Sequence, residues 1–164
     1  MLKNWRSQHP LGYRSGAVGG YIFAYKAADE TVNNSATLQN DDDLLLALAA
    51  NEVWAFKLVV IYLSGTTPDI KWHWTGPSGF TYDSSVSSFS SALSVAFGNP
   101  DESDSSPEHI TGGRGATEVG FVWEGVVRCS TTAGNFQLQW AQNTQDASDT
   151  KVLAGSYLIA WRLA

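Results

Sequence analysis

Residue types that carry enzyme chemistry are present in this sequence, but their spacing matches no familiar catalytic pattern. The histidines His9, His73 and His109 lie far apart, and none has a partner at the spacing of metal ligands. No serine lies in a Gly-x-Ser-x-Gly motif, so the sequence does not predict a serine nucleophile. Cys129 is the only cysteine and lies in an apolar run, so we interpret it as a reduced core thiol.

An acidic segment could bind a cation and a glycine-rich segment could bind a phosphate, but each could also be a loop without a ligand. Asp41, Asp42 and Asp43 lack the alternation and the closing glutamate of an EF-hand, which favours a solvated turn over a calcium site. Residues 112–115 lack the lysine and the following helix of a P-loop, which favours a flexible loop. A pair of catalytic carboxylates for glycoside hydrolysis stays an alternative, because two such residues can be far apart in the sequence and close together in the fold. The sequence thus assigns no catalytic, cofactor-binding or metal-binding residue and predicts a protein that is not an enzyme.

Aromatic residues are the distinctive feature of the composition, with seven Trp, seven Phe and six Tyr. Charged residues make up only 16%, and many aromatics with little charge are typical of the centre of protein interfaces. Five tryptophans lie in the apolar phase of alternating segments and form the candidate oligomer interface: Trp72, Trp74, Trp123, Trp140 and Trp161. A wide core filled by these rings is one alternative, and a platform that stacks on glycans is another.

Apolar and polar residues alternate with a period of two in several segments, which is typical of β-strands. The clearest cases are residues 70–75, 119–129, 136–141 and 156–163, and clusters of Gly, Ser, Asn, Asp and Pro separate them. Residues 44–50 are ambiguous between helix and strand, and we interpret them as a strand that follows an acidic turn at 40–43. The pattern predicts an all-β fold, an antiparallel β-sandwich that is jelly-roll-like.

Charge divides the chain into two parts. Residues 1–28 hold four basic and no acidic residues, whereas residues 29–164 hold six basic and sixteen acidic residues, so the net charges are +4 and −10. We interpret the first part as a basic, Gly-rich N-terminal arm and the second as a single β-sandwich domain. Four arm residues are expected to dock on a protein partner: Trp5, Arg6, Tyr13 and Arg14. Four positive charges among Gly, Tyr and Leu make a weak phosphate footprint, so no nucleic-acid partner is predicted.

Five segments resemble a β-sandwich domain of virion proteins from tailed bacteriophages: residues 29–41, 50–56, 70–79, 134–143 and 152–158. The most specific of them has the sequence GNFQLQWAQN and runs from Gly134 to Asn143. The order of the segments is also similar, at the level of topology, to the jelly rolls of the tumour-necrosis-factor and C1q class. The resemblance covers essentially all of residues 29–164 and leaves the arm outside.

The resemblance implies a non-enzymatic structural protein of the virion, a head-decoration or tail-adaptor protein that docks on capsid or tail proteins. It also implies a homotrimer whose aromatic sheet faces pack around a three-fold axis. A receptor- or glycan-binding module of a tail fibre is the alternative, and it would require Trp72 or Trp74 at the surface. No secretory signal and no run of eighteen apolar residues are visible, so we expect folding in the cytoplasm of the bacterial host and no membrane insertion.

Overall fold

Twelve β-strands and no helix make up the part of the chain that the computed structural model describes, residues 20–88, 95–97 and 108–164. The strands are β1 (Tyr21–Tyr25), β2 (Glu30–Asn33), β3 (Gln39–Leu48), β4 (Val53–Leu63), β5 (Ile70–Thr75), β6 (Thr81–Ser88), β7 (Val95–Phe97), β8 (His109–Thr111), β9 (Val119–Arg128), β10 (Gly134–Gln142), β11 (Asp149–Val152) and β12 (Tyr157–Arg162). The predicted all-β sandwich is confirmed. The described residues contain no apolar helix that could cross a membrane.

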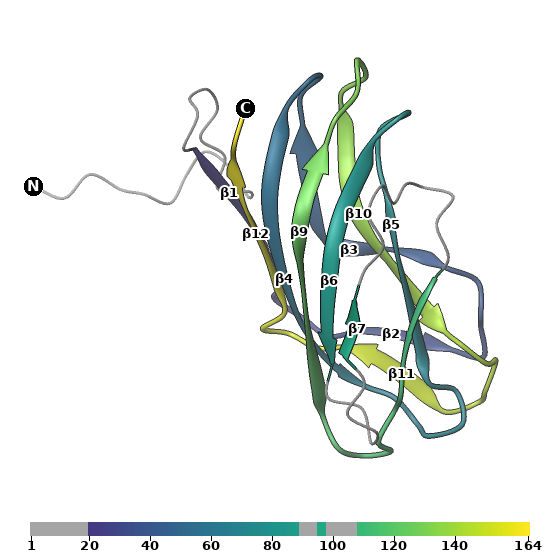
Figure 1. Cartoon of the computed structure of the whole chain (residues 1–164). Helices are drawn as coiled ribbons and strands as arrows, with labels where there is room; N and C mark the ends of the chain where they lie inside the picture. Colours follow the sequence, from purple (N-terminus) through teal and green to yellow (C-terminus); the bar gives the residue numbers. More distant parts are fainter. Residues whose placement is uncertain (1–19, 89–94, 98–107) are drawn as a thin grey trace, which may run out of the picture.

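The strands form two antiparallel sheets that pack face to face (Figure 1). One sheet has the order β3-β10-β5-β8, and the other contains the order β4-β9-β6-β7. Most strands that follow one another in the sequence lie in opposite sheets, so these eight form the two interlocked Greek keys of a jelly roll. Strands β12 and β1 extend the second sheet beyond β4, while β11 joins β4 to β2. In Figure 1 the pair β1 and β12 forms one flank of the molecule.

Aromatic rings fill the space between the two sheets. Trp74 on β5 stacks on Phe136 of β10 with ring centroids 4.1 Å apart, and Phe56 of β4 meets Trp74 edge-on at 5.3 Å. Every second residue of β4 is buried, as expected for a strand with one face on the core. The buried apolar residues run from Ile22 to Ala160, so the core begins on β1, inside the range 1–28 that the sequence interpretation assigned to the arm.

The acidic segment 40–43 is not a turn, which corrects the sequence interpretation. These residues belong to β3, which pairs with β10 across a register shift between Gln137 and Gln139. The Asp41 side chain is fully buried, and its Oδ1 atom accepts hydrogen bonds from the backbone N–H groups of Asp43 and Leu44. The irregularity turns a carboxylate inward that a regular solvated turn would expose. The strand predicted at 44–50 is confirmed as far as Leu48.

The two ends of the described chain meet at one end of the sandwich. The Arg162 N–H donates to the Gly20 carbonyl oxygen at 2.8 Å, and the Leu163 N–H donates to the Val53 carbonyl oxygen at 2.7 Å. Figure 1 shows the end of β12 beside the start of β1. These bonds fasten the last strand between β1 and β4.

Replacing Trp74 by alanine removes the central ring of the core. We expect the free energy of unfolding of the Trp74→Ala variant to fall by about 3–5 kcal/mol, because a buried ring is replaced by a cavity. Chemical denaturation monitored by circular dichroism measures this difference. The control is Ile110→Ala, because Ile110 is 58% exposed; a surface site of this kind should change the free energy by about 0.5 kcal/mol or less. Equal losses in the two variants would contradict the assigned core.

Candidate functional site

Large apolar side chains are exposed on one part of the molecule. Seven such side chains are exposed among the described residues, and six of them lie on β1, on β12 or directly after β12. On β1, Ile22 and Ala24 point into the core, whereas Tyr21, Phe23 and Tyr25 remain between 43% and 57% exposed. A strand with apolar residues on both faces needs a cover on both faces. Only the inner face is covered by described residues.

Strand β12 continues the exposed surface beside β1. The antiparallel register places Tyr21 opposite Trp161 and Tyr25 opposite Tyr157, with Phe23 opposite Ile159 between them. Directly opposed side chains on one face of a sheet contact one another and stabilise the pairing. We call this surface the aromatic face; it consists of Tyr21, Phe23, Tyr25, Tyr157, Ile159 and Trp161.

The apolar surface extends from the aromatic face onto β4 and β9. Trp161 pairs with Ala55, which pairs with Val126, and Tyr157 pairs with Val59, which pairs with Val122. Because these side chains are smaller than the aromatic rings, they protrude less from the sheet than the aromatic face does.

Charge enters the surface as ion pairs, one of which joins Arg128 at the end of β9 to Asp83 on β6 at 2.6 Å. Between the apolar rows lies the pair Lys57 and Glu124, with Nζ and Oε2 3.8 Å apart and both side chains well exposed. An exposed pair of this kind contributes little to stability. It leaves the surface without net charge.

The outer face of the other sheet has a different character. It presents amides such as Gln137, whose Nε2 donates to the carbonyl oxygen of Asp41, and Gln139, whose Nε2 donates to Asn40 Oδ1. Ile110 on β8 is the one exposed large apolar side chain of that sheet within the described residues. Exposed aromatic area is therefore a property of one face rather than of the whole surface.

A buried lysine fastens the end of β1 to neighbouring strands. The Lys26 ammonium lies 2.6 Å from Glu30 Oε2 on β2, 3.0 Å from Asp41 Oδ1 on β3 and 3.4 Å from Asp43 Oδ2. Asp41 is held in turn by the Trp140 indole, whose Nε1 donates to Asp41 Oδ2 at 3.2 Å. One cation thus joins strands of both sheets directly behind the aromatic face.

The carboxylates keep the Lys26 ammonium charged. Burial alone would lower the pKa of Lys26, but the hydrogen bond to Glu30 and the charges of Asp41 and Glu30 raise it above 10.5 overall. A protonated amine has no free electron pair and cannot act as a nucleophile. The cluster is therefore suited to holding strands together rather than to chemistry.

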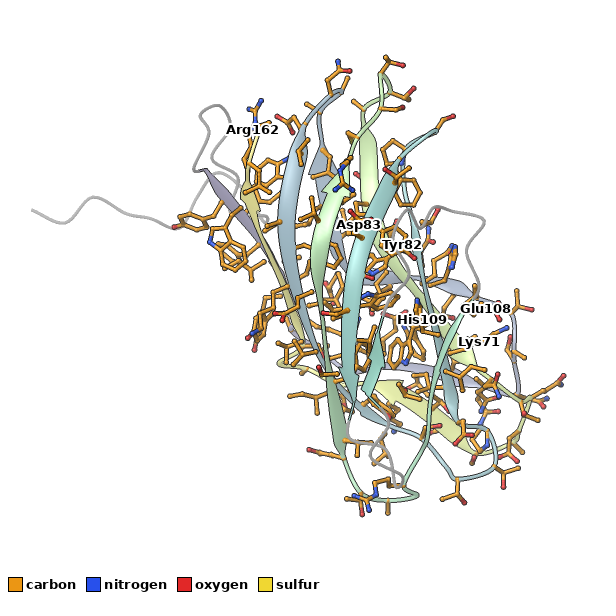
Figure 2. The ribbon with its side chains drawn as sticks, in the orientation of Figure 1. Lys71, Tyr82, Asp83, Glu108, His109 and Arg162 are labelled. Atoms are coloured by element: carbon orange, nitrogen blue, oxygen red, sulfur yellow. The ribbon has the colours of Figure 1, made fainter. Side chains whose placement is uncertain are left out.

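The far end of the aromatic face has its own ionic attachment. The Arg162 Nη1 atom lies 3.0 Å from Glu52 Oε1, and Glu52 also accepts hydrogen bonds from Trp54 Nε1 and from the N–H of Ala49. Figure 2 shows Arg162 at the end of the molecule where β12 ends. Both ends of the β1–β12 pair are thereby fixed.

The structure places four of the five predicted interface tryptophans inside the core. Trp72, Trp74, Trp123 and Trp140 are at most 1% exposed, so no second chain can contact them, and they fill the core as in the alternative considered for them. Trp161 is 42% exposed, and its interface role stays a prediction. This corrects the candidate interface for the four buried residues.

The aromatic face contains residues that the sequence pattern did not identify. In β12 the residues that face the core are Leu158 and Ala160. The sequence pattern instead places Trp161 in the set of alternating residues that faces either the core or a neighbouring subunit. Both phases of this strand are apolar, so hydrophobicity alone cannot choose the inner one. The exposure of Tyr21, Phe23 and Tyr25 could have been predicted from one feature of the sequence. Residues 21–25 are apolar on both faces of a short strand, and the core can cover only one of these faces.

Two of the three histidines belong to the described part of the chain. His73 and His109 lie on neighbouring strands, and Figure 2 shows His109 beside Glu108 and Lys71, which form an ion pair of 3.1 Å. Within the described ranges, no group of three or more His, Cys, Asp or Glu side chains could hold a metal ion. Cys129 is a buried free thiol, and burial and the charge of Glu52 raise its pKa.

Several predicted positions have no structural description. The arm residues Trp5, Arg6, Tyr13 and Arg14, and also His9, lie outside the described residues. Their predicted docking role stays a prediction.

Comparison with known proteins does not place the chain in a family. No protein-family model matches the sequence, and no curated protein matches it. The exposed surface is therefore the feature of the molecule that bears on its function.

Removing the charge of Lys26 should weaken the attachment of β1. We expect Lys26→Met to lower the free energy of unfolding by about 3–5 kcal/mol, because it leaves the buried Asp41 carboxylate without its cation. Because the pKa of Lys26 is raised in the folded state, this stabilisation is present at neutral pH and is lost as the pH rises above 10.5. Urea denaturation across pH measures both effects, and the variant should lack the part of the alkaline loss that comes from Lys26.

The matched control for this charge removal is Lys151→Met. Lys151 forms a surface pair of 3.5 Å with Asp149, and such pairs contribute about 0–1 kcal/mol. Similar losses in the two lysine variants would show that the Lys26 cluster is not a special attachment.

Proposed function

We propose that this chain is a non-enzymatic structural protein of a bacteriophage particle, which works by docking to copies of itself and to other virion proteins through the aromatic face. The observation that carries the docking role is the concentration of exposed aromatic side chains on β1 and β12. Large contiguous apolar surface is unusual on monomeric proteins and marks a contact surface.

The composition of the aromatic face supports a protein partner. Tyr and Trp are enriched among the residues that dominate binding energy, and they bring large contact areas with few rotatable bonds. The adjoining small side chains, Ala55, Val59, Val122 and Val126, offer a low apolar surface on the same sheet. A partner that covers both parts removes apolar area from water over four neighbouring strands.

The assignment to a phage particle has a separate basis. It follows the resemblance of residues 29–164 to β-sandwich proteins of tailed phages, and the jelly-roll strand order is compatible with it. A compact single sandwich suits a head-decoration or tail-adaptor protein, which covers a junction between other subunits. The proposed surroundings are capsid or tail proteins of the same virion.

The glycan-binding alternative was based on two tryptophans that are not at the surface. Trp72 and Trp74 would have to be exposed to stack on a sugar ring, but both lie in the core. The exposed rings extend over two neighbouring strands, which suits an extended protein contact more than a small ligand.

Placing a charge on the aromatic face tests the proposal. We expect the wild-type protein to have a solution mass above that of one chain, and Trp161→Glu to lower this mass, because a carboxylate would be desolvated in the contact. Multi-angle light scattering over a concentration series measures it, and the association constant should fall at least about tenfold for the loss of a central aromatic contact.

The control for Trp161→Glu is Ile110→Glu, which places the same charge on the exposed Ile110 of the other sheet. Its solution mass should equal that of the wild type. A wild-type protein that remains a single chain at every concentration would contradict docking between copies, and equal effects of the two variants would contradict a role specific to the aromatic face.

A further inference from the structure

Within the described residues, the edge of strand β1 that faces away from β12 forms no ladder with another strand, although β3 lies near it. Lys26 N–H donates to Ser156 O at 2.9 Å, and Gly20 O accepts from Arg162 N–H at 2.8 Å, so these two residues direct their backbone groups toward β12. Backbone groups of successive residues in an antiparallel strand point to opposite edges. Those of Tyr21, Phe23 and Tyr25 therefore point away from β12, and within the described residues β1 pairs with β12 alone.

This edge lacks the features that keep strand edges from pairing. Proteins protect open edges with charged side chains, prolines or bulges. The terminal strands β2 and β3 follow this rule, since they carry Glu30, Asp42 and Asp43. Residues 21–25 contain no charge and no proline, and the pairing of β1 with β12 has no register shift. An unprotected edge with aromatic side chains is suited to adding a strand.

The sequence of β1 is nearly symmetric about its centre. Tyr21 and Tyr25 lie at equal distances on either side of Phe23, and all three side chains point to the same face. Two identical strands that pair antiparallel about Phe23 would place Tyr21 opposite Tyr25 of the other copy and the two Phe23 residues opposite each other. A two-fold contact requires this kind of self-complementarity.

We propose that β1 pairs antiparallel with β1 of a second copy of this chain, so that the two sheets become continuous across a two-fold axis at Phe23. Three hydrogen-bonded residue pairs that each exchange two bonds would add about six backbone hydrogen bonds. The aromatic faces of both copies then lie on the same side of the joined sheet and form one larger surface. This inference rests on the proposed function, because it names one partner of the same surface.

Electrostatics favours a second copy over an acidic or basic partner at this edge. No charged side chain lies between Gly20 and Tyr25. The Lys26 ammonium is paired with three carboxylates of its own chain, and pairing about Phe23 would place Lys26 beside Gly20 of the other copy rather than beside its own symmetry mate. Like charges therefore do not face each other across the axis. The arrangement is two-fold and differs from the three-fold packing that the tumour-necrosis-factor resemblance implies.

Proline at position 23 tests the backbone pairing. The Phe23 N–H points to the open edge, so Phe23→Pro removes no hydrogen bond to β12, and proline is tolerated on edge strands. Phe23→Ala is the matched variant, because it removes the same ring and keeps the N–H group. We expect Phe23→Pro to weaken association at least tenfold more than Phe23→Ala, with unfolding midpoints that show both variants to be folded.

Combining this variant with Trp161→Glu separates the two proposals by light scattering. If both proposals hold, the wild type should form assemblies larger than a dimer, Trp161→Glu should reduce them to a dimer, and the double variant should be a single chain. If Trp161→Glu alone gives a single chain, the aromatic face holds the copies together, the proposed function stands and strand pairing is wrong. If Phe23→Pro lowers the mass but Trp161→Glu does not, strand pairing stands and docking through the aromatic face is wrong.

A disulfide cross-link tests directly whether the two Phe23 positions meet at the two-fold axis, and it does not depend on the proline variant. Paired residues of this type have Cα atoms about 5.5 Å apart, within the range that a disulfide can span. In a Cys129→Ala background, Phe23→Cys should oxidise to a covalent dimer. Val59→Cys should not, because β4 lies two strands from β1 and its symmetry mate would be roughly 20 Å or more away. Cross-linking of Val59→Cys but not Phe23→Cys would overturn the pairing.

Discussion

The attachment of β1 to the sandwich depends on one buried cation. Lys26 leaves β1 at the point where the strand ends, and its ammonium contacts carboxylates on β2 and β3 while it is shielded from water. Burying a charge is costly unless it is paired, so the cluster forms only when all of these segments are in their native positions. Strand β1 contributes only Ile22 and Ala24 to the core. An edge strand with so little buried area needs an additional attachment to hold three aromatic rings in a fixed arrangement.

The aromatic residues divide into a buried group and an exposed group, because the space between the sheets is limited. The rings of Trp72, Trp74, Trp123 and Trp140 fill the wide space between the sheets, and three of their indole N–H groups find acceptors, such as Thr111 for Trp72 and Ser84 for Trp123. A core that already holds these rings has no space for a further set. Tyr157, Trp161 and the aromatic residues of β1 lie outside it and are exposed to water.

Much of the fold follows from the sequence, whereas the site follows only in part. The alternation in residues 70–75 and 136–141 predicts strands with a definite inner face, because their two phases differ in polarity. Strand β12 has two apolar phases, so its inner face is decided by the pairing of Leu158 with Leu58 in the folded sheet. Asp41 could not be recognised as buried, since its partner Lys26 lies fifteen residues away and a local pattern does not contain that contact. The aromatic face combines both difficulties, because it is assembled from strands at opposite ends of the sequence.

The meeting of Gly20 and Arg162 has a practical consequence for any attached molecule. Residues at both ends of the described chain lie beside the same corner of the sheet, next to Tyr21 and Trp161. A reporter domain fused after Ala164 would therefore lie at the margin of the aromatic face and would compete sterically with the proposed partner. A reporter inserted instead near the exposed Thr67, in the turn between β4 and β5, would be joined to the opposite end of the sandwich (Figure 1). The position of the label thus decides whether a fusion reads out association or prevents it.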